Sequence, residues 1–205
     1  MVIFGITGPT GAGKTSALRA INALGALTLD CDAIYHELLE TNEELKSDLE
    51  NRFSGVLKDG IIDRKILREI VFWDPQALSD LNAITHMYIG AELEARLEKW
   101  KMSGGTVAAI DAIALIESGR AKSCDIVVGV IAPGEVRIER IMKRDGITKD
   151  QAEMRVNAQK ADSFYEDNCD YILENYNNTP EDFEQECKEF FTMLYDKNFV
   201  RRTDL

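Results

Sequence analysis

The sequence predicts an α/β fold of three layers, α/β/α, in which helices cover both faces of a five-stranded parallel sheet. Apolar runs of strand length alternate along the chain with stretches of helical periodicity, which is the pattern of a doubly wound sheet. Several of these runs are continuously apolar, as expected for parallel strands that are buried on both faces. The chain has 205 residues, of which 45% are hydrophobic. This is enough for one sizeable core, so we expect a single domain.

Five segments have the composition of such strands: residues 2–7, 26–30, 106–111, 125–131 and 170–174. The first helix should follow over 15–24 and end at Gly25, where a left-handed residue is favoured. A capping box formed by Thr148 and Gln151 predicts the start of a later helix. Thr179 followed by Pro180 predicts the start of the last helix.

The interval between the second and third strands is too long for one crossover helix. It contains helical patterns at 32–41, 63–73 and 75–102 and a polar segment at 42–53, and we expect Phe72 and Trp73 to be core aromatics. An insertion of this size usually carries substrate recognition in such folds. The domain should therefore divide into a core (1–31, 104–132 and 161–205), a helical acceptor-binding insertion (about 32–103) and a lid (about 133–160).

The first strand leads directly into a phosphate-binding motif. Residues 8–16 read Gly-Pro-Thr-Gly-Ala-Gly-Lys-Thr-Ser and match G-x-x-x-x-G-K-[ST] between a predicted strand and a predicted helix. Glycines let backbone N–H groups converge on phosphate oxygens, and the helix N-terminus adds its positive end. The sequence therefore predicts a P-loop NTPase fold that binds a nucleoside triphosphate through Gly11, Ala12, Gly13, Lys14, Thr15 and Ser16. Lys14 would reach the β- and γ-phosphates, and the Thr15 hydroxyl would bind Mg²⁺.

Acidic residues stand where two of the predicted strands end. Asp111 closes the strand at 106–111, the pattern of a Walker B carboxylate that organises Mg²⁺. Asp30 and Asp32 lie at the end of the second strand. A carboxylate repels the γ-phosphate, so Asp32 there suggests a use, which is to accept the proton of an attacking hydroxyl. Asp32 could also be the N-cap of the following helix, and Asp30 could be a structural residue at a strand end.

A basic window interrupts an acidic chain. The formal net charge is −12, yet residues 133–160 contain seven basic and five acidic residues. Arg137, Arg140 and Arg144 fall near one helical face, ahead of an Asp-Gly turn and the capped helix. We expect a helix–turn–helix lid that closes over the triphosphate and stabilises transition-state charge. The alternative is a solvated amphipathic helix with surface ion pairs.

The acidity argues against an extended nucleic-acid surface and against binding to an anionic membrane. Residues 161–199 hold eleven acidic residues against two lysines, whereas residues 1–29 hold two basic residues and no acidic one. The four cysteines lack metal or redox spacing, and no apolar stretch reaches the length of a membrane span. We expect a cytoplasmic protein with a local phosphate site.

Taken together, these motifs resemble the dephospho-CoA kinase family nearly end to end. The matching segments are residues 5–15, Asp30-Cys-Asp-Ala-Ile-Tyr-His36 for the family's D-A-D-x-I-x-H/R, 63–65, 70–72, 74–75, 84–86, 140–146, Gln159 and 172–175. The resemblance implies transfer of the ATP γ-phosphate to the ribose 3′-hydroxyl of dephospho-CoA. It implies Asp32, Lys14 and Arg140 as catalytic residues, Arg144 with the loop for ATP, Asp32, Arg64 and His86 for the acceptor, and Thr15 and Asp111 for Mg²⁺.

The chain departs from the family pattern at three places. The family's D-x-P-L-L-[FL]-E is here Asp111-Ala-Ile-Ala-Leu-Ile-Glu117, which keeps both acidic residues but loses the proline. Met87 replaces a usual proline after His86, and Tyr165 replaces a usual lysine. The alternative within this fold is another P-loop kinase that acts on a nucleotide or a metabolite. A GTPase-type switch needs an N-K-x-D motif, and the nearest string, at 157–162, does not have it.

Overall fold

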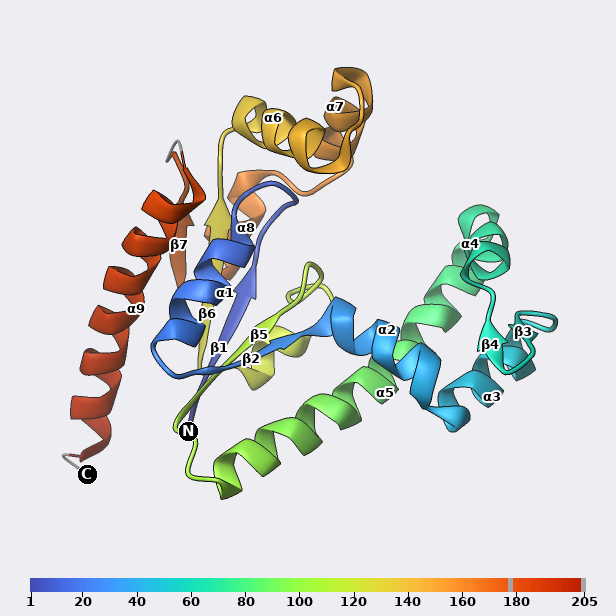
Figure 1. Cartoon of the computed structure of the whole chain (residues 1–205), viewed down its shortest axis with the longest axis horizontal. Coiled ribbons are helices and arrows are strands. Elements are labelled where there is room, and N and C mark those ends of the chain that lie inside the picture. Colours follow the sequence, from blue (N-terminus) through green and yellow to red (C-terminus); the bar gives the residue numbers. More distant parts are fainter. Residues whose placement is uncertain (177–178, 204–205) are drawn as a thin grey trace. The chain divides into compact units, whose positions relative to one another are not determined.

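The computed structural model describes residues 1–176 and 179–203, with side chains described as far as Tyr195 (Figure 1). The chain forms two compact units: unit 1 is Met1–Leu29 with Gly104–Leu205, and unit 2 is Asp30–Ser103. The predicted core ran to residue 205, and its residues 177–178 and 204–205 lie outside the described part. Among the described residues, no helix is long and apolar enough to cross a membrane.

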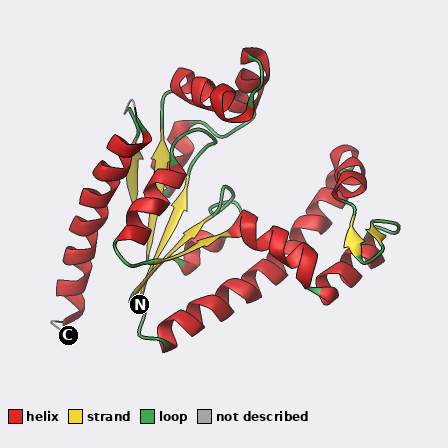
Figure 2. Cartoon of the chain, in the orientation of Figure 1, coloured by secondary structure: helices red, strands yellow, loops and turns green. Residues whose placement is uncertain are grey.

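A five-stranded sheet forms the centre of unit 1 (Figure 2). Its strands are β1 (Val2–Thr7), β2 (Leu27–Asp30), β5 (Val107–Asp111), β6 (Ile126–Ile131) and β7 (Tyr171–Glu174), in the order β2-β5-β1-β6-β7. β1 pairs in parallel with β5 and β6, and β6 pairs in parallel with β7. Each predicted strand is confirmed to within one residue. The chain leaves β1 for the edge strand β2, so the end of β1 is a switch point, where α/β sheets bind ligands.

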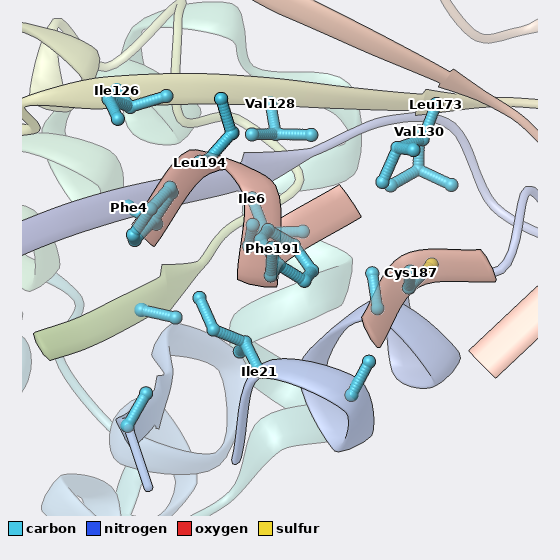
Figure 3. Packing of buried hydrophobic residues seen from close by; sticks show 14 of the residues in the cluster. Phe4, Ile6, Ile21, Ile126, Val128, Val130, Leu173, Cys187, Phe191 and Leu194 are labelled. Atoms are coloured by element: carbon cyan, nitrogen blue, oxygen red, sulfur yellow. The ribbon is translucent and has the colours of Figure 1, made fainter. Parts of the chain in front are cut away.

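One face of this sheet packs against α1 (Lys14–Ala23) and α9 (Pro180–Thr203). The pleat directs alternate residues of β1 towards these helices, among them Phe4 and Ile6. Phe4 meets Phe191 of α9 edge to face, with ring centroids 5.7 Å apart (Figure 3). This face is the main hydrophobic core of the unit.

The opposite face of the sheet is covered at close range because two of its residues are glycines. A Cβ at Gly5 would lie 2.6 Å from Cδ2 of Leu115, in the turn segment after β5. A Cβ at Gly129 would lie 3.0 Å from Sγ of Cys169, directly after α8 (Asp162–Asn168). Helical layers thus flank both faces, and the predicted α/β class is confirmed. The sequence interpretation did not include α8, which is too short to show a period.

A helical hairpin lies above the carboxyl end of the sheet in Figure 1, formed by α6 (Gly134–Asp145) and α7 (Lys149–Asn157). The predicted capping box is confirmed, because Thr148 Oγ1 accepts from the N–H of Gln151 while the Gln151 side chain accepts from the N–H of Thr148. The start of α9 is confirmed as well, with Thr179 Oγ1 accepting from the N–H of Asp182 at 3.1 Å.

Unit 2 is built around one long helix. Its helices are α2 (Cys31–Thr41), α3 (Glu43–Arg52), α4 (Arg64–Trp73) and α5 (Pro75–Met102), and α2, α3 and α4 each pack against α5. α5 has the bounds that the sequence predicts; Asp74 caps it and Pro75 occupies its first position. Arg96 of α5 binds Glu37 of α2 at 2.7 Å.

A two-stranded hairpin in unit 2 was not predicted. It pairs β3 (Leu57–Lys58) with β4 (Ile61–Ile62) through Asp59 and Gly60, whose φ angles are 52° and 78°. Two central residues with positive φ make a type I′ turn, for which Asp-Gly is a preferred pair. The signal was therefore present in the sequence, but the strands are only two residues long.

Two sequence interpretations are wrong. Asp32 is not the N-cap of α2: Asp30 is, since its Oδ1 accepts from the N–H groups of Asp32 (2.8 Å) and Ala33 (3.1 Å). Phe72 and Trp73 are not core residues but are 70% and 83% exposed, with their rings in edge-to-face contact at 4.7 Å. Leu67 marks the buried stripe of α4, and the two aromatics lie beyond that stripe in the last turn.

Candidate active site

The loop between β1 and α1 has the backbone of a phosphate cradle. Gly8, Gly11 and Gly13 have φ angles of 142°, 82° and 115°, which side chains rarely allow. The loop is also packed tightly from outside, because a Cβ at Gly8 would lie 2.1 Å from the carbonyl oxygen of Val130. Glycine is required here for conformation and for space, and the loop delivers the chain into the N-terminus of α1, where backbone N–H groups favour anions.

The chemistry-bearing residues of the loop are close together. Lys14 Nζ donates to the carbonyl oxygen of Gly8 at 2.8 Å, so the ammonium folds back across the loop. Thr15 is exposed on the first turn of α1, and Ser16 is buried behind it. The predicted nucleotide-binding residues, Gly11 to Ser16, therefore span the end of the loop and the first turn of α1 in unit 1.

Arg137 fastens one side of the loop. Its Nε donates to the carbonyl oxygen of Thr10 at 3.0 Å, and its Nη2 donates to Oε1 of Gln159 at 2.6 Å. Gln159 also binds Thr10, with Nε2 donating to the hydroxyl at 2.9 Å and Oε1 accepting from the N–H at 3.0 Å. Arg137 is 4% exposed, and burial lowers its pKa. Sequence reasoning placed Arg137 on a lid face but missed its role as a support of the loop.

Arg140 reaches the next two carbonyl groups. Its Nη1 donates to the oxygens of Gly11 (3.2 Å) and Ala12 (3.3 Å), and its Nη2 donates to Oδ1 of Asn175 at 3.0 Å. Burial lowers the pKa of Arg140. The structure therefore brings one predicted catalytic residue, Arg140, directly to the predicted nucleotide loop.

Arg144 lies apart from these loop contacts, at the turn of the α6–α7 hairpin. Its Nε binds Oδ1 of Asp145 at 2.7 Å, and hydrogen bonding to Asp145 raises the pKa of Arg144. Arg155 of α7 binds the other oxygen of the same carboxylate. The three arginines that the sequence places on one face thus have three different settings.

Thr15 and Asp111 have the donor chemistry that Mg²⁺ prefers. Asp111 is the last residue of β5, and its register partner in β1 is Ile6, so it stands at the end of the sheet from which the loop departs. Oδ1 of Asp111 is shielded from solvent. A hydroxyl and a carboxylate are hard oxygen ligands, and Mg²⁺ commonly uses one or two such groups together with substrate phosphates and water. The donor set fits the predicted ion.

In unit 2, Asp32 is exposed on the first turn of α2. One turn further along this helix, Nε2 of His36 lies 3.5 Å from Nη2 of Arg64, the first residue of α4. Burial raises the pKa of the neighbouring Tyr35, and the charge of Arg64 partly offsets this. His86 is half-buried on α5. Arg64 therefore joins the motif that contains Asp32, a contact that sequence spacing did not reveal.

The chain is similar to known proteins along most of its length. A family model described as dephospho-CoA kinase matches residues 2–181. The chain belongs to the dephospho-CoA kinase family. A dephospho-CoA kinase of Geobacter sulfurreducens is 34% identical over 197 residues, covering 95% of this chain and 100% of the relative.

Solved structures agree with the family assignment. The dephospho-CoA kinase of Campylobacter jejuni superposes with a TM-score of 0.70 at 28% identity, covering 96% of this chain and 98% of that one. The protein TT1252 of Thermus thermophilus gives a TM-score of 0.78 at 27% identity, covering 94% and 97%.

The positions at which this family member departs from the family pattern have clear local settings. Tyr165 is buried beside Gly129, and burial raises its pKa to about 12, so it is a packing residue. Ile113, which stands where the family pattern has a proline, and Met87 are both exposed. Sequence reasoning quoted Asn175 as part of the family pattern without a role. Its place directly after a predicted strand was the available signal.

Proposed function

We propose that this chain transfers the γ-phosphate of ATP to the ribose 3′-hydroxyl of dephospho-CoA and releases coenzyme A and ADP. The observation that carries the proposal is the glycine loop with Lys14 and Thr15, built between β1 and α1 in a chain that a dephospho-CoA kinase model matches over residues 2–181. The substrates are two small molecules, and the cytoplasm, where ATP is available, is the compartment we propose.

The loop binds the triphosphate. Backbone N–H groups of the loop and of the N-terminus of α1 face its negative charge, and Lys14 neutralises the β- and γ-phosphates. Arg140 and Arg144 add positive charge from α6, which stabilises the charge that develops during transfer. The half-buried Arg140 already contacts the loop through Gly11, whereas Arg144 is exposed and belongs to the hairpin turn.

Thr15 and Asp111 would hold Mg²⁺, which when bound neutralises phosphate charge. Asp32 accepts the proton. Because Asp30 serves as the cap, the Asp32 carboxylate is not needed to cap α2. A carboxylate within hydrogen-bond reach of an attacking hydroxyl can accept its proton.

The reaction balances with these residues. The bond between the γ-phosphorus and the bridging oxygen of ADP breaks, and a bond forms between that phosphorus and the 3′-oxygen of the acceptor. The hydroxyl proton passes to the Asp32 carboxylate, and the electron pair of the broken bond leaves with ADP. Arg64 and His86 of unit 2 are proposed to hold the acceptor, whose diphosphate suits the guanidinium of Arg64.

The competing proposal is a P-loop kinase for another nucleotide or metabolite. A panel of acceptors distinguishes the two proposals. Dephospho-CoA, AMP, adenosine, shikimate and pantothenate are each supplied at equal concentration with ATP and Mg²⁺. We expect kcat/KM for dephospho-CoA to exceed that for every other acceptor by at least about a hundredfold, because the site must engage more than the adenosine group. A higher value for any other acceptor would replace the proposed one.

A further inference from the structure

We propose that Asn175 is a positioning residue for ATP: its side-chain amide, together with Arg140, holds the P-loop in the conformation that receives phosphate. The proposal rests on the ATP-binding part of the proposed function and not on the identity of the acceptor. Asn175 follows β7, far from the loop in sequence, and it carries no role in the predicted site.

Both polar atoms of the Asn175 side chain form hydrogen bonds. Its Nδ2 donates to the carbonyl oxygen of Ala12 at 2.8 Å, and its Oδ1 accepts from Nη2 of Arg140 at 3.0 Å. Arg140 in turn donates to the same Ala12 oxygen at 3.3 Å. Asn175 is only 3% exposed. A buried amide that satisfies a loop carbonyl and a guanidinium simultaneously fixes their relative position, because an unmatched buried polar group is costly.

The contact determines the direction of a loop N–H group. The peptide bond is planar and trans, so the C=O of Ala12 and the N–H of Gly13 point in opposite directions within the peptide plane. Asn175 and Arg140 hold that C=O from the outside of the loop. The N–H of Gly13 is therefore directed towards the other side of the loop, where a phosphate would accept from it. Arg137 has the same effect two residues earlier, by holding the C=O of Thr10.

The protein makes room for this amide. A Cβ at Gly13 would lie 2.3 Å from Nδ2 of Asn175 and 3.1 Å from Cε1 of Phe183. The glycine before Lys14 is thus needed for the approach of Asn175 as well as for its φ of 115°. The backbone of Asn175 is itself anchored, since its N–H donates to the carbonyl oxygen of Ile131 at 2.8 Å, at the end of the neighbouring β6. The sheet therefore sets where the amide stands.

The test measures ATP affinity of the full-length protein by calorimetry for the wild type, Asn175→Ala and Asn175→Asp. Alanine removes both hydrogen bonds. Aspartate keeps the size and the acceptor for Arg140 but places a carboxylate against the Ala12 oxygen. We expect each variant to bind ATP about tenfold more weakly, because the loop carbonyl loses its neutral donor, while KM for dephospho-CoA stays within twofold. The matched control is Asn168→Ala, which removes a side-chain bond to the carbonyl oxygen of Phe164 (2.8 Å), and it should bind ATP like the wild type.

A purely structural role predicts a different pattern. In that case the variants would melt at a lower temperature but, while folded, would bind ATP within twofold of the wild type, and this result would overturn the proposal. If Asn175→Ala does not fold, Asn175→Asp alone decides the question by the same criterion. Failure of the acceptor panel would leave this result unaffected, because ATP binding is measured without acceptor.

Discussion

Lys14 supplies a positive charge from within the loop itself. Its ammonium bonds to the Gly8 oxygen across the loop, at 2.8 Å, and the other residues of the motif at 8–16 are uncharged. Residues 1–29 contain Lys14 and Arg19 as their basic residues and no acidic residue. Removal of this ammonium should therefore leave the charge of a bound triphosphate less well neutralised.

Lys14→Ala should lower kcat/KM by roughly two to three orders of magnitude, because charge stabilisation in the transition state is lost. The measurement is steady-state ADP release with saturating acceptor. Lys149→Ala is the control, since Lys149 is an exposed lysine on α7 that pairs with Glu153 at 3.5 Å. Equal activity of the two variants would contradict the assigned role of Lys14.

Asp32→Asn should abolish phosphoryl transfer while ATP binding stays close to that of the wild type, because an amide cannot accept the hydroxyl proton. Single-turnover transfer and ATP calorimetry measure the two quantities separately. Asp30→Asn is the matched control: asparagine caps a helix as well as aspartate does, so α2 and turnover should be preserved. Near-normal turnover of Asp32→Asn would rule out Asp32 as the base.

Some residues of the candidate site could be predicted from the sequence and others could not. The loop motif predicts Lys14 and Thr15 as site residues from their type and spacing, and the acidic end of a strand predicts Asp111. The sequence did not show that Arg137 and Asn175 bind the loop, because these contacts join residues more than a hundred positions apart. Such contacts depend on the order of the strands, which spacing along the chain does not contain.

Among the elements, the α6–α7 hairpin is closed by one carboxylate. Asp145 binds Arg144 of its own helix and Arg155 of α7. Hydrogen bonding to Arg144 lowers the pKa of Asp145 below its usual 3.8. A lowered pKa means that this interaction stabilises the hairpin above about pH 3.8 and is lost as the pH falls through the folded-state value.

Asp145→Asn should loosen α7, because a neutral amide holds two guanidinium groups less well than a carboxylate does. The expected result at neutral pH is faster hydrogen exchange of the amides of residues 149–157, with the sheet amides unchanged. Asp167→Asn, an exposed carboxylate on α8, serves as the control. Unchanged exchange in α7 would show that the hairpin does not depend on this carboxylate.

Truncation of an aromatic side chain should affect the free energy of unfolding strongly in α9 and hardly at all at the end of α4. Phe191 of α9 is buried against Phe4, so Phe191→Ala should lower the free energy of unfolding by about 3–5 kcal/mol. Trp73 at the end of α4 is largely exposed, so Trp73→Ala should change it by less than about 0.5 kcal/mol. Chemical denaturation measures both. A large loss in Trp73→Ala would place that ring in a packed environment after all.

Elements with strong periodicity were predictable and short ones were not. The five strands and α5 follow the sequence pattern closely, since continuous apolar runs and a cap with Pro75 at the first position are unambiguous. The β3–β4 hairpin and α8 are too short for a period, and the contacts that hold them come from the tertiary structure. The prediction for Phe72 and Trp73 was wrong because it rested on their hydrophobicity alone, and both side chains lie off the buried face of α4.

At the scale of the whole molecule, the net charge of −12 is unevenly distributed. Residues 1–29 and residues 133–160 are each net positive, and residues 161–199 carry most of the excess acid. The topology accounts for the use of the positive segments: β1 leads into the loop at the switch point of the sheet, and α6 follows β6, the neighbour of β1. An acidic chain can in this way present a local site for phosphates.

The central claim is that this protein is a kinase whose acceptor is dephospho-CoA. The most direct measurement is ADP release from ATP and Mg²⁺ with and without dephospho-CoA, with coenzyme A quantified by mass spectrometry in the same samples. We predict that ADP release depends on the acceptor and equals the coenzyme A formed, one for one. ADP release that is the same without dephospho-CoA, or that occurs without formation of coenzyme A, would contradict the claim.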